Sequence, residues 1–348
     1  MIKFQEVPNA DDDFIVVGKS AEGWITWDLN KHPHGLIVGT TGSGKSNTVR
    51  FVFNEFQKKK NWLPYMIDFK GGSDYYFLDG KYQLITNIEE FIAFIKELYS
   101  ELEYRQKLFK DLRTSKINKV NSLLRKSGKD TIPRLMIFID EFAIISSLKK
   151  DMKTSLVETI EQLMQRGRSF GMSFTLIVQK PTAENLGSSY IRSLIGFRLI
   201  GKLEDEADYK MSFGASNNFS GEDKLFADKM KNEADFIGRF IVKGGYIGDN
   251  PVGRNIIVRV PHMEEEDYDN MVLNEWEYNP YADYELHYDE EAIKELDKES
   301  KEVLDKIYGK GEENLVEGVS YEVINEETEV EEAEAVQDDI QDFLNNFR

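Results

Sequence analysis

Two hydrophobic patterns alternate along the first 260 residues of the chain. Short, predominantly apolar runs predict buried strands, and they occupy Leu36–Val38, Tyr65–Ile67, Leu135–Ile139, Phe174–Val178, Phe197–Ile200 and Phe236–Val242. Longer segments with apolar residues three or four positions apart predict helices, at Asn47–Phe56, at Phe91–Leu112 and over about residues 152–169. The segments Phe14–Val17 and Trp24–Trp27, joined by a turn with two glycines, predict a β-hairpin. Because strands alternate with helices, the pattern indicates an α/β fold with a mostly parallel sheet flanked by helices.

The pattern changes after residue 280. Residues 291–306 predict a polar helix with several Glu–Lys pairs, whereas residues 312–335 are acidic, contain few aromatic residues and predict disorder. A helical spacing returns near the C-terminus, at Ile340, Phe343, Leu344 and Phe347. We therefore predict a β-hairpin extension over residues 1–30, an α/β domain over residues 31–280, and an acidic tail, partly helical or disordered, over residues 281–348.

The charge of the chain is unevenly distributed. The net charge is −19, from 63 acidic and 44 basic side chains. Residues 281–348 hold 23 of the acidic and 6 of the basic ones, which leaves 40 and 38 for the rest of the chain. The body is therefore nearly neutral, and its overall acidity does not exclude a nucleic-acid partner. A stretch from Lys107 to Lys129 contains eight basic residues and one acid, and it is either a grip on the DNA backbone or a solvated linker.

Composition excludes several other classes of protein. Without cysteine the chain can form no disulfide or thiolate metal site, which suits a reducing cytoplasm. No apolar run approaches the ~20 residues that cross a bilayer. We expect a cytoplasmic protein that a partner recruits to the membrane if it acts there.

The first apolar strand leads into a glycine-rich loop. Gly39-Thr40-Thr41-Gly42-Ser43-Gly44-Lys45-Ser46 fits the pattern G-x-x-x-x-G-K-S, and a helical segment follows it. In such a loop the backbone N–H groups and the helix N-terminus surround phosphate oxygens. Lys45 can reach the β- and γ-phosphates, and the Ser46 hydroxyl can ligate Mg²⁺. The sequence therefore predicts an ATP and Mg²⁺ site, against the alternative of a chance glycine-rich turn.

Two later strands end in polar residues that suit the same chemistry. Asp140 and Glu141 follow Leu135–Ile139, where Asp140 can hold Mg²⁺ with Ser46 and Glu141 can deprotonate the attacking water. Gln179 follows the next strand and can sense the γ-phosphate or the water; the alternative is a capping polar residue. Since the carboxyl ends of parallel strands meet at one edge of the sheet, we expect these side chains to converge.

Three arginines and two histidines remain to be assigned. Arg168, with Arg166 as the next candidate, can neutralise transition-state charge in a neighbouring subunit, or it is an ordinary surface residue. Arg105 lies on the apolar stripe of the long predicted helix, where it either snorkels or belongs to a site or an interface. His32 and His34 flank a proline before the first buried strand and are interpreted as turn residues.

Together these motifs resemble the FtsK/SpoIIIE family of hexameric DNA-pumping ATPases, within the wider HerA–FtsK group. The resemblance runs from about Val17 to Val242 and is most specific in Asp28–Ser46, Ile139–Ala143, Arg168–Met172 and Val178–Pro181. It implies a RecA-like P-loop fold, ATP hydrolysis coupled to DNA translocation, and assembly into a hexameric ring.

The resemblance also implies roles for single residues. Nucleotide is bound by Gly39, Thr40, Thr41, Gly42, Ser43, Gly44, Lys45 and Ser46; Mg²⁺ is held by Ser46 and Asp140; and the catalytic residues are Glu141, Gln179 and Arg168, the last acting in trans. Asp68–Gly72 is similar to a motif of conjugative coupling ATPases and of type VII secretion ATPases. Two departures are the lack of transmembrane helices and of the basic C-terminal module found in chromosome-segregation members.

Three functions are compatible with this sequence. The first is a ring motor that moves DNA by contacts to its phosphate backbone, without sequence specificity, in conjugative transfer, plasmid or phage DNA handling, or segregation. The second is a motor for protein substrates of a type VII-like secretion system. The third is a nucleotide-dependent assembly scaffold. The acidic tail is a candidate site for a protein recruiter, an internal competitor of DNA, or only a solubilising appendage.

Overall fold

The computed structural model describes residues 2–78, 84–214, 221–232, 237–264, 266–267 and 279–298. The chain divides into two units, Met1–Ser300 and Lys301–Arg348, and all of the described residues belong to the first. The predictions for residues 312–335 and 340–347 lie outside the described residues.

The strands form one 12-stranded sheet in the order β11-β10-β2-β1-β12-β9-β8-β3-β7-β6-β4-β5. Half of it is parallel and contains β3 (Gly35–Val38), β4 (Trp62–Asp68), β5 (Leu84–Ile85), β6 (Arg134–Asp140), β7 (Met172–Val178) and β8 (Phe197–Ile200). All of these strands except β5 were expected from the sequence. The other half is antiparallel and contains β1 (Phe14–Ser20), β2 (Gly23–Asp28), β9 (Arg239–Lys243), β10 (Gly245–Ile247), β11 (Asn250–Pro251) and β12 (Ile256–Arg259). The fold class is confirmed as α/β with a mixed sheet.

The N-terminal hairpin is confirmed, and it is built into this sheet. β1 pairs with β2 along its length and with β12 at Lys19 and Arg259, while β10 adds to the other side of β2. The antiparallel half joins the parallel half where β9 pairs with β8. The division at residue 30 remains a prediction, but the hairpin and the strand that carries the glycine-rich loop share one sheet.

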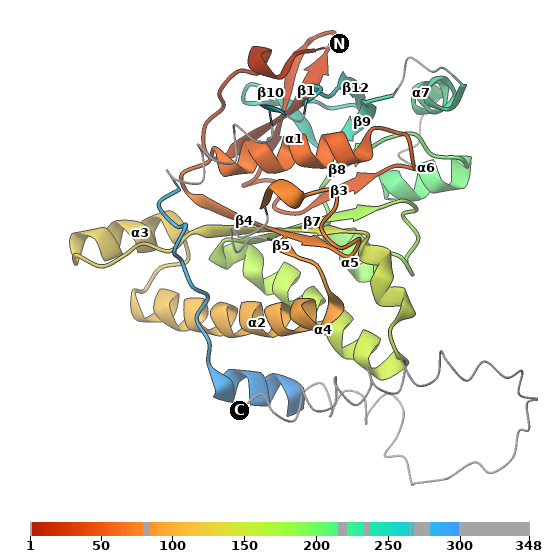
Figure 1. Ribbon diagram of the computed structural model, residues 1–348. Coiled ribbons are helices and arrows are strands. Elements are labelled where there is room, and N and C mark those ends of the chain that lie inside the picture. Colours follow the sequence, from red (N-terminus) through yellow and green to blue (C-terminus); the bar gives the residue numbers. More distant parts are fainter. Residues whose placement is uncertain are drawn as a thin grey trace, which may run out of the picture. The chain divides into compact units, whose positions relative to one another are not determined.

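Helices cover both faces of the parallel half (Figure 1). They are α1 (Lys45–Gln57), α2 (Ile88–Asp111), α3 (Ile117–Lys126), α4 (Lys150–Gly167), α5 (Ser189–Leu194), α6 (Glu206–Phe213) and α7 (Gly221–Asn232), with short 3₁₀ turns η1 (Phe4–Glu6), η2 (Tyr76–Leu78), η3 (Phe142–Ser147) and η4 (Arg168–Phe170). α1 contacts β1 as well as β3 and β4, so it lies between the two halves of the sheet. α2 and α4 pack together on the opposite face.

Side-chain alternation in β6 shows how the two faces are filled. Leu135, Ile137 and Ile139 belong to the apolar cluster that includes α2 and α4, whereas Met136 and Phe138 belong to the cluster around α1. All five are fully buried, and burying a side chain of this size stabilises the fold by roughly 1.5–3 kcal/mol. Because the strand is buried on both faces, its sequence is apolar at consecutive positions.

The first residues of the predicted tail pack on the body. Tyr281 and Leu296 are buried in the cluster that contains α2. Residues 284–289 run without regular structure, and residues 290–298 form a helix, which is the described part of the predicted polar helix. The boundary at residue 280 remains a prediction, but any removal of the tail has to spare the residues up to 298.

Candidate functional site

The polar residues expected to converge do so at the carboxyl edge of the parallel strands. The glycine-rich loop leaves β3, Asp140 is the last residue of β6, and Gln179 follows β7 directly. β4 contributes Asp68, which is the register partner of Asp140. Four neighbouring strands therefore deliver their terminal side chains to one place.

The glycine-rich loop is held closely by its surroundings. Gly44 has a φ of 89°, in the region that favours glycine, and a Cβ there would lie 2.8 Å from the Gly238 nitrogen. A Cβ on Gly39 would lie 2.6 Å from Ser43 Oγ. The Gly238 N–H donates to the Ser43 carbonyl (3.0 Å), and both donors of Thr40 reach the carbonyl of Lys202. The loop is thus packed closely against its neighbours, and larger residues at these two glycines would disturb that packing.

Two donors in this loop are buried without a protein partner. Lys45 is only 8% exposed, and neither its Nζ nor Ser43 Oγ has a hydrogen-bond acceptor among the described residues. Burial lowers the pKa of Lys45, and the charges of Asp140 and Glu141 oppose that effect. An unpaired buried ammonium is costly, and the phosphates of a nucleotide are a fitting partner for it. The loop therefore has the donor set that ATP requires.

Asp140 is oriented by a buried tyrosine that the sequence did not mark as part of the site. The Tyr75 hydroxyl donates to Asp140 Oδ2 (2.8 Å), and the Glu141 N–H donates to Oδ1 (2.8 Å). Burial, reinforced by the charge of Asp140, raises the pKa of Tyr75, so the phenol stays protonated as a donor. Ser46 at the start of α1 and Asp140 supply oxygens of the kind that Mg²⁺ prefers. They fit a site that is completed by phosphate oxygens and water.

Glu141 is held by two side chains from neighbouring strand ends. It has a φ of 57°, uncommon for a residue with a side chain and frequent at functional sites. Its Oε2 accepts from Gln179 Nε2 (3.1 Å) and forms an ion pair with Lys70 Nζ (3.3 Å). The structure thus brings Gln179 to Glu141. Burial raises the pKa of Asp68, and its Oδ2 has no partner in the described structure.

Asp68 and Lys70 belong to Asp68–Gly72, which the sequence analysis used only as a marker of family branches. Their place at the end of an apolar strand was the signal that could have assigned them to the site, by the argument used for Asp140 and Glu141. Tyr75 carried no such signal, because it lies in a glycine-rich segment without a periodic pattern.

Arg168 lies at the opposite edge of the sheet. It begins η4, just before β7 starts, whereas Gln179 follows the end of β7. The seven residues of β7 span about 20 Å, so Arg168 cannot reach the nucleotide edge of its own subunit. It is exposed and borders a cavity of about 340 Å³ that also contacts Lys116 and Arg134. Within the described residues its guanidinium has no hydrogen bond or ion pair.

Arg166, the next candidate, is already engaged. It donates to Glu103 (2.6 Å), to Gln106 (3.0 Å) and to Gln162 (3.1 Å), and it forms an ion pair with Glu103. The contacts to Glu103 and Gln106 join Arg166 to α2, and the contact to Gln162 lies within α4, its own helix. Arg168 is therefore the better placed of the two to contact a neighbouring molecule.

The structure excludes one of the alternatives for Arg105 and adds a contact to the interpretation of His34. Arg105 is fully buried, so it does not snorkel. His34 lies in a loop but is also buried: its Nδ1 accepts from the Phe174 N–H (3.1 Å), and its Nε2 donates to the Met164 carbonyl (2.9 Å). It therefore joins β7 to α4, and burial lowers its pKa to about 4.

The basic stretch is helical. It comprises the end of α2, a turn, and α3, whose Ile117, Val120 and Leu124 pack on Phe109 in a small separate core. Its eight basic side chains are exposed, and none forms an ion pair within the described residues. The eight exposed basic side chains are compatible with both alternatives, a grip on the DNA backbone and a solvated charged linker.

The side chain of Arg198 is buried and holds backbone segments together. Its buried guanidinium on β8 donates to the carbonyls of Arg192, Ile195 and Ser212, and burial lowers its pKa to about 10. Lys210 forms an exposed ion pair with Glu206.

A parallel sheet flanked by helices, with a glycine-rich loop after one strand and acidic residues after a neighbouring one, defines a P-loop ATPase. The sequence model of the FtsK/SpoIIIE family matches residues 14–199. The chain belongs to the FtsK/SpoIIIE family. Membership of this ATPase family implies nucleotide binding, for which Mg²⁺ is typical.

Individual relatives lie in more than one branch. The chain is 33% identical over 199 residues to the type VII secretion system protein EssC of Staphylococcus aureus, covering 52% of this chain and 13% of EssC. It is 27% identical over 226 residues to the DNA translocase FtsK of Campylobacter jejuni, covering 61% of this chain and 23% of FtsK. The aligned part is thus less than a quarter of either relative.

Solved structures confirm the fold. The pCW3 conjugation coupling protein TcpA, solved as a monomer with ATPγS, matches with a TM-score of 0.63 at 23% identity, over 78% of this chain and 73% of TcpA. The cytoplasmic domain of the type VII secretion ATPase EccC from Thermomonospora curvata matches with a TM-score of 0.59 at 19% identity, over 78% and 32%. Across the described residues, none of the helices has the length and apolarity to cross a bilayer.

Proposed function

We propose that the protein is an ATP-hydrolysing ring motor that translocates DNA. The observation that supports a ring is that the nucleotide-binding residues and Arg168 lie at opposite edges of the sheet in one subunit. Lys45, Asp140 and Glu141 lie at the carboxyl edge of the sheet, and the exposed Arg168 lies at the amino edge. An arginine supplied by a neighbour stabilises the charge that develops on the transferred phosphoryl group. We therefore infer a hexameric ring in which each interface completes one site.

Within one site, each residue of this chain has a separate task. The backbone of Gly39–Ser46 and the Lys45 ammonium bind the β- and γ-phosphates, while Ser46 and Asp140 hold Mg²⁺, which neutralises phosphate charge. Glu141 accepts the proton of the attacking water. Gln179 keeps the Glu141 carboxylate in place through their hydrogen bond.

The ion pair of Glu141 with Lys70 is partly exposed on both sides. Such a pair contributes no more than about 1 kcal/mol, so the binding of nucleotide can displace Lys70 and leave the carboxylate to the water. The carboxylate is therefore held in place before nucleotide binds, without being blocked.

The basic surface formed by the end of α2 and α3 supports DNA as the substrate. Exposed lysine and arginine side chains without carboxylate partners bind backbone phosphates irrespective of sequence and in a salt-dependent manner. Lys116 borders the Arg168 cavity and therefore faces the neighbouring subunit, so we assign the grip to the other seven basic residues. Work on the DNA of a mobile element, as in conjugative transfer, or DNA segregation would use such a grip.

A second candidate function is a motor for protein substrates. It is favoured by the identity to EssC, which is higher than the identity to FtsK. A nucleotide-dependent scaffold is a third candidate, and the complete set of Glu141, Gln179 and Arg168 argues against it.

The test of hydrolysis is Glu141→Gln. The amide keeps the shape of the side chain and can still accept from Gln179, while Asp140 and Tyr75 are unchanged. We expect ATP to remain bound and hydrolysis to fall by about 10²–10⁴-fold. Glu206→Gln, which removes an exposed carboxylate paired with Lys210, is the matched control and should hydrolyse normally. Hydrolysis by Glu141→Gln at the unmodified rate would refute the assignment of the base.

A further inference from the structure

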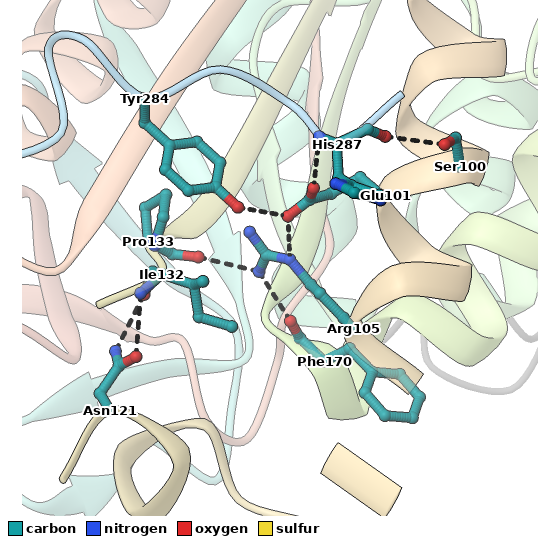
Figure 2. A network of polar contacts seen from close by, with 9 residues as sticks. All are labelled: Ser100, Glu101, Arg105, Asn121, Ile132, Pro133, Phe170, Tyr284 and His287. Carbon is teal, nitrogen blue, oxygen red and sulfur yellow. Dashed lines mark hydrogen bonds and ion pairs between the residues drawn. The ribbon is translucent and has the colours of Figure 1, made fainter. Parts of the chain in front are cut away.

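A buried ion pair on α2 has no role in the site described so far. Glu101 and Arg105 are both fully buried, with Oε1 and Nε 2.6 Å apart (Figure 2). Removing two charges from water is expensive, and further hydrogen bonds to both groups offset part of that cost, although Arg105 Nη2 has no partner among the described residues. The partners of this pair come from segments far apart in the sequence.

The glutamate faces residues 279–289, a turn followed by a stretch without regular structure, which we call the strap. Glu101 Oε1 accepts from the Tyr284 hydroxyl (2.6 Å), and Oε2 accepts from the His287 N–H (2.8 Å). The Ser100 hydroxyl donates to the His287 carbonyl (2.7 Å) and accepts from the Asp289 N–H (2.6 Å). The strap is therefore fastened to one turn of α2 by four hydrogen bonds, two of them to a carboxylate.

The arginine faces the segment that carries Arg168. Its Nη1 group donates to the carbonyls of Pro133 and Phe170, each at 2.8 Å. Phe170 ends η4, the single turn that Arg168 begins, and Pro133 directly precedes β6. Figure 2 shows the guanidinium between these two carbonyls. Arg105 thus ties η4 to the entry of a central strand.

We propose that Glu101, Arg105 and Tyr284 are positioning residues for Arg168, and that the strap is thereby part of the active site of the neighbouring subunit. The inference rests on the trans role of Arg168 in the proposed function. Because the Arg168 side chain has no partner within the described residues, its place is set by the backbone of η4, and that backbone is held by Arg105. Tyr284 and the His287 N–H in turn hold the glutamate that orients Arg105.

A mild substitution is the proper probe. Replacing Arg105 or Glu101 leaves an uncompensated buried charge and endangers the fold. Tyr284→Phe removes one hydroxyl and keeps the ring. Tyr281→Phe is the matched control, because Tyr281 belongs to the same strap and shares a hydrogen bond of 2.9 Å with Thr131 without touching Glu101 or Arg105.

The readout is ATP hydrolysis by rings mixed from two variants. A displacement of about 1 Å can cost up to about 10²-fold in rate, so we expect Tyr284→Phe to lower kcat by about tenfold or more with KM for ATP unchanged, and Tyr281→Phe to leave both unchanged. Mixing Tyr284→Phe subunits with Lys45→Ala subunits should restore activity, as it should for Arg168→Ala. In both mixtures the Lys45→Ala subunit presents an intact Arg168 to the intact nucleotide edge of its neighbour.

The remaining outcomes overturn the inference in distinguishable ways. If Arg168→Ala is rescued but Tyr284→Phe has normal kcat, or is slow and not rescued, the strap does not position Arg168 and the proposed function stands. If Arg168→Ala itself is not rescued in verified mixed rings, the trans role of Arg168 fails, and the inference fails with it.

Discussion

Acid should weaken this protein through His34. The side chain is buried as the neutral ring, with Nδ1 accepting from the Phe174 N–H and Nε2 donating to the Met164 carbonyl. A proton on Nδ1 would face the Phe174 N–H and break that hydrogen bond. Burial therefore lowers the pKa of His34 to about 4, from 6.5 for an exposed histidine.

The pKa difference gives the size and the sign of the effect. The folded protein binds the proton less well than the unfolded chain does, so the contribution of His34 is fully present above pH 6.5 and is lost as the pH falls towards 4. A difference of 2.5 pKa units corresponds to about 3 kcal/mol in the free energy of unfolding. The steepest loss from one such group is about 1.4 kcal/mol per pH unit.

Urea unfolding between pH 8 and 4, in the unmodified protein and in His34→Gln, measures this contribution. The variant should be less stable at pH 8, and the difference between the two proteins should shrink as the pH falls below 6.5. A pH-independent difference for His34→Gln, or an NMR titration of the His34 ring with a midpoint near 6.5, would refute the reasoning.

Four further outcomes follow from the contacts of single residues. Lys45→Ala should abolish binding of a fluorescent ATP analogue, because the buried ammonium that faces the phosphates is lost. Tyr75→Phe should lower kcat several-fold without changing KM for ATP, since Asp140 loses one of its two hydrogen bonds; equal kcat values would refute a role in orienting that carboxylate. Arg198→Met leaves three carbonyls unpaired and should lower the thermal midpoint, each lost bond costing roughly 1 kcal/mol. Truncation after Lys298, which keeps the strap, should tighten DNA binding and steepen its salt dependence if the acidic tail competes with DNA; unchanged binding in a titration would exclude that competition.

Much of the parallel half could be predicted because its strands are buried on both faces. β6 is apolar at every position from Leu135 to Ile139, and such runs can be recognised without knowing their neighbours. The glycine-rich loop could also be predicted, since its function depends on the backbone conformation of eight consecutive residues, Gly39–Ser46. The antiparallel strands β10, β11 and β12 were missed: they have two to four residues, too short for a period of two to show.

The environments of single polar side chains could not be predicted. Arg105 was noticed because it interrupts an apolar stripe, but its acceptors Pro133 and Phe170 are 28 and 65 residues away in the sequence. His34 likewise depends on Met164 and Phe174, which only the folded sheet brings near it. Periodicity shows that a residue faces the core, whereas the partner that satisfies it is set by tertiary packing.

The rate of ATP hydrolysis with and without linear double-stranded DNA tests the central claim most directly. It is measured on the assembled protein, with Glu141→Gln showing the rate that does not come from this site. The proposed DNA motor predicts a faster rate with DNA and a stimulation that weakens as salt is raised. A rate that DNA leaves unchanged at every salt concentration, in a protein that hydrolyses ATP through Glu141, would contradict it.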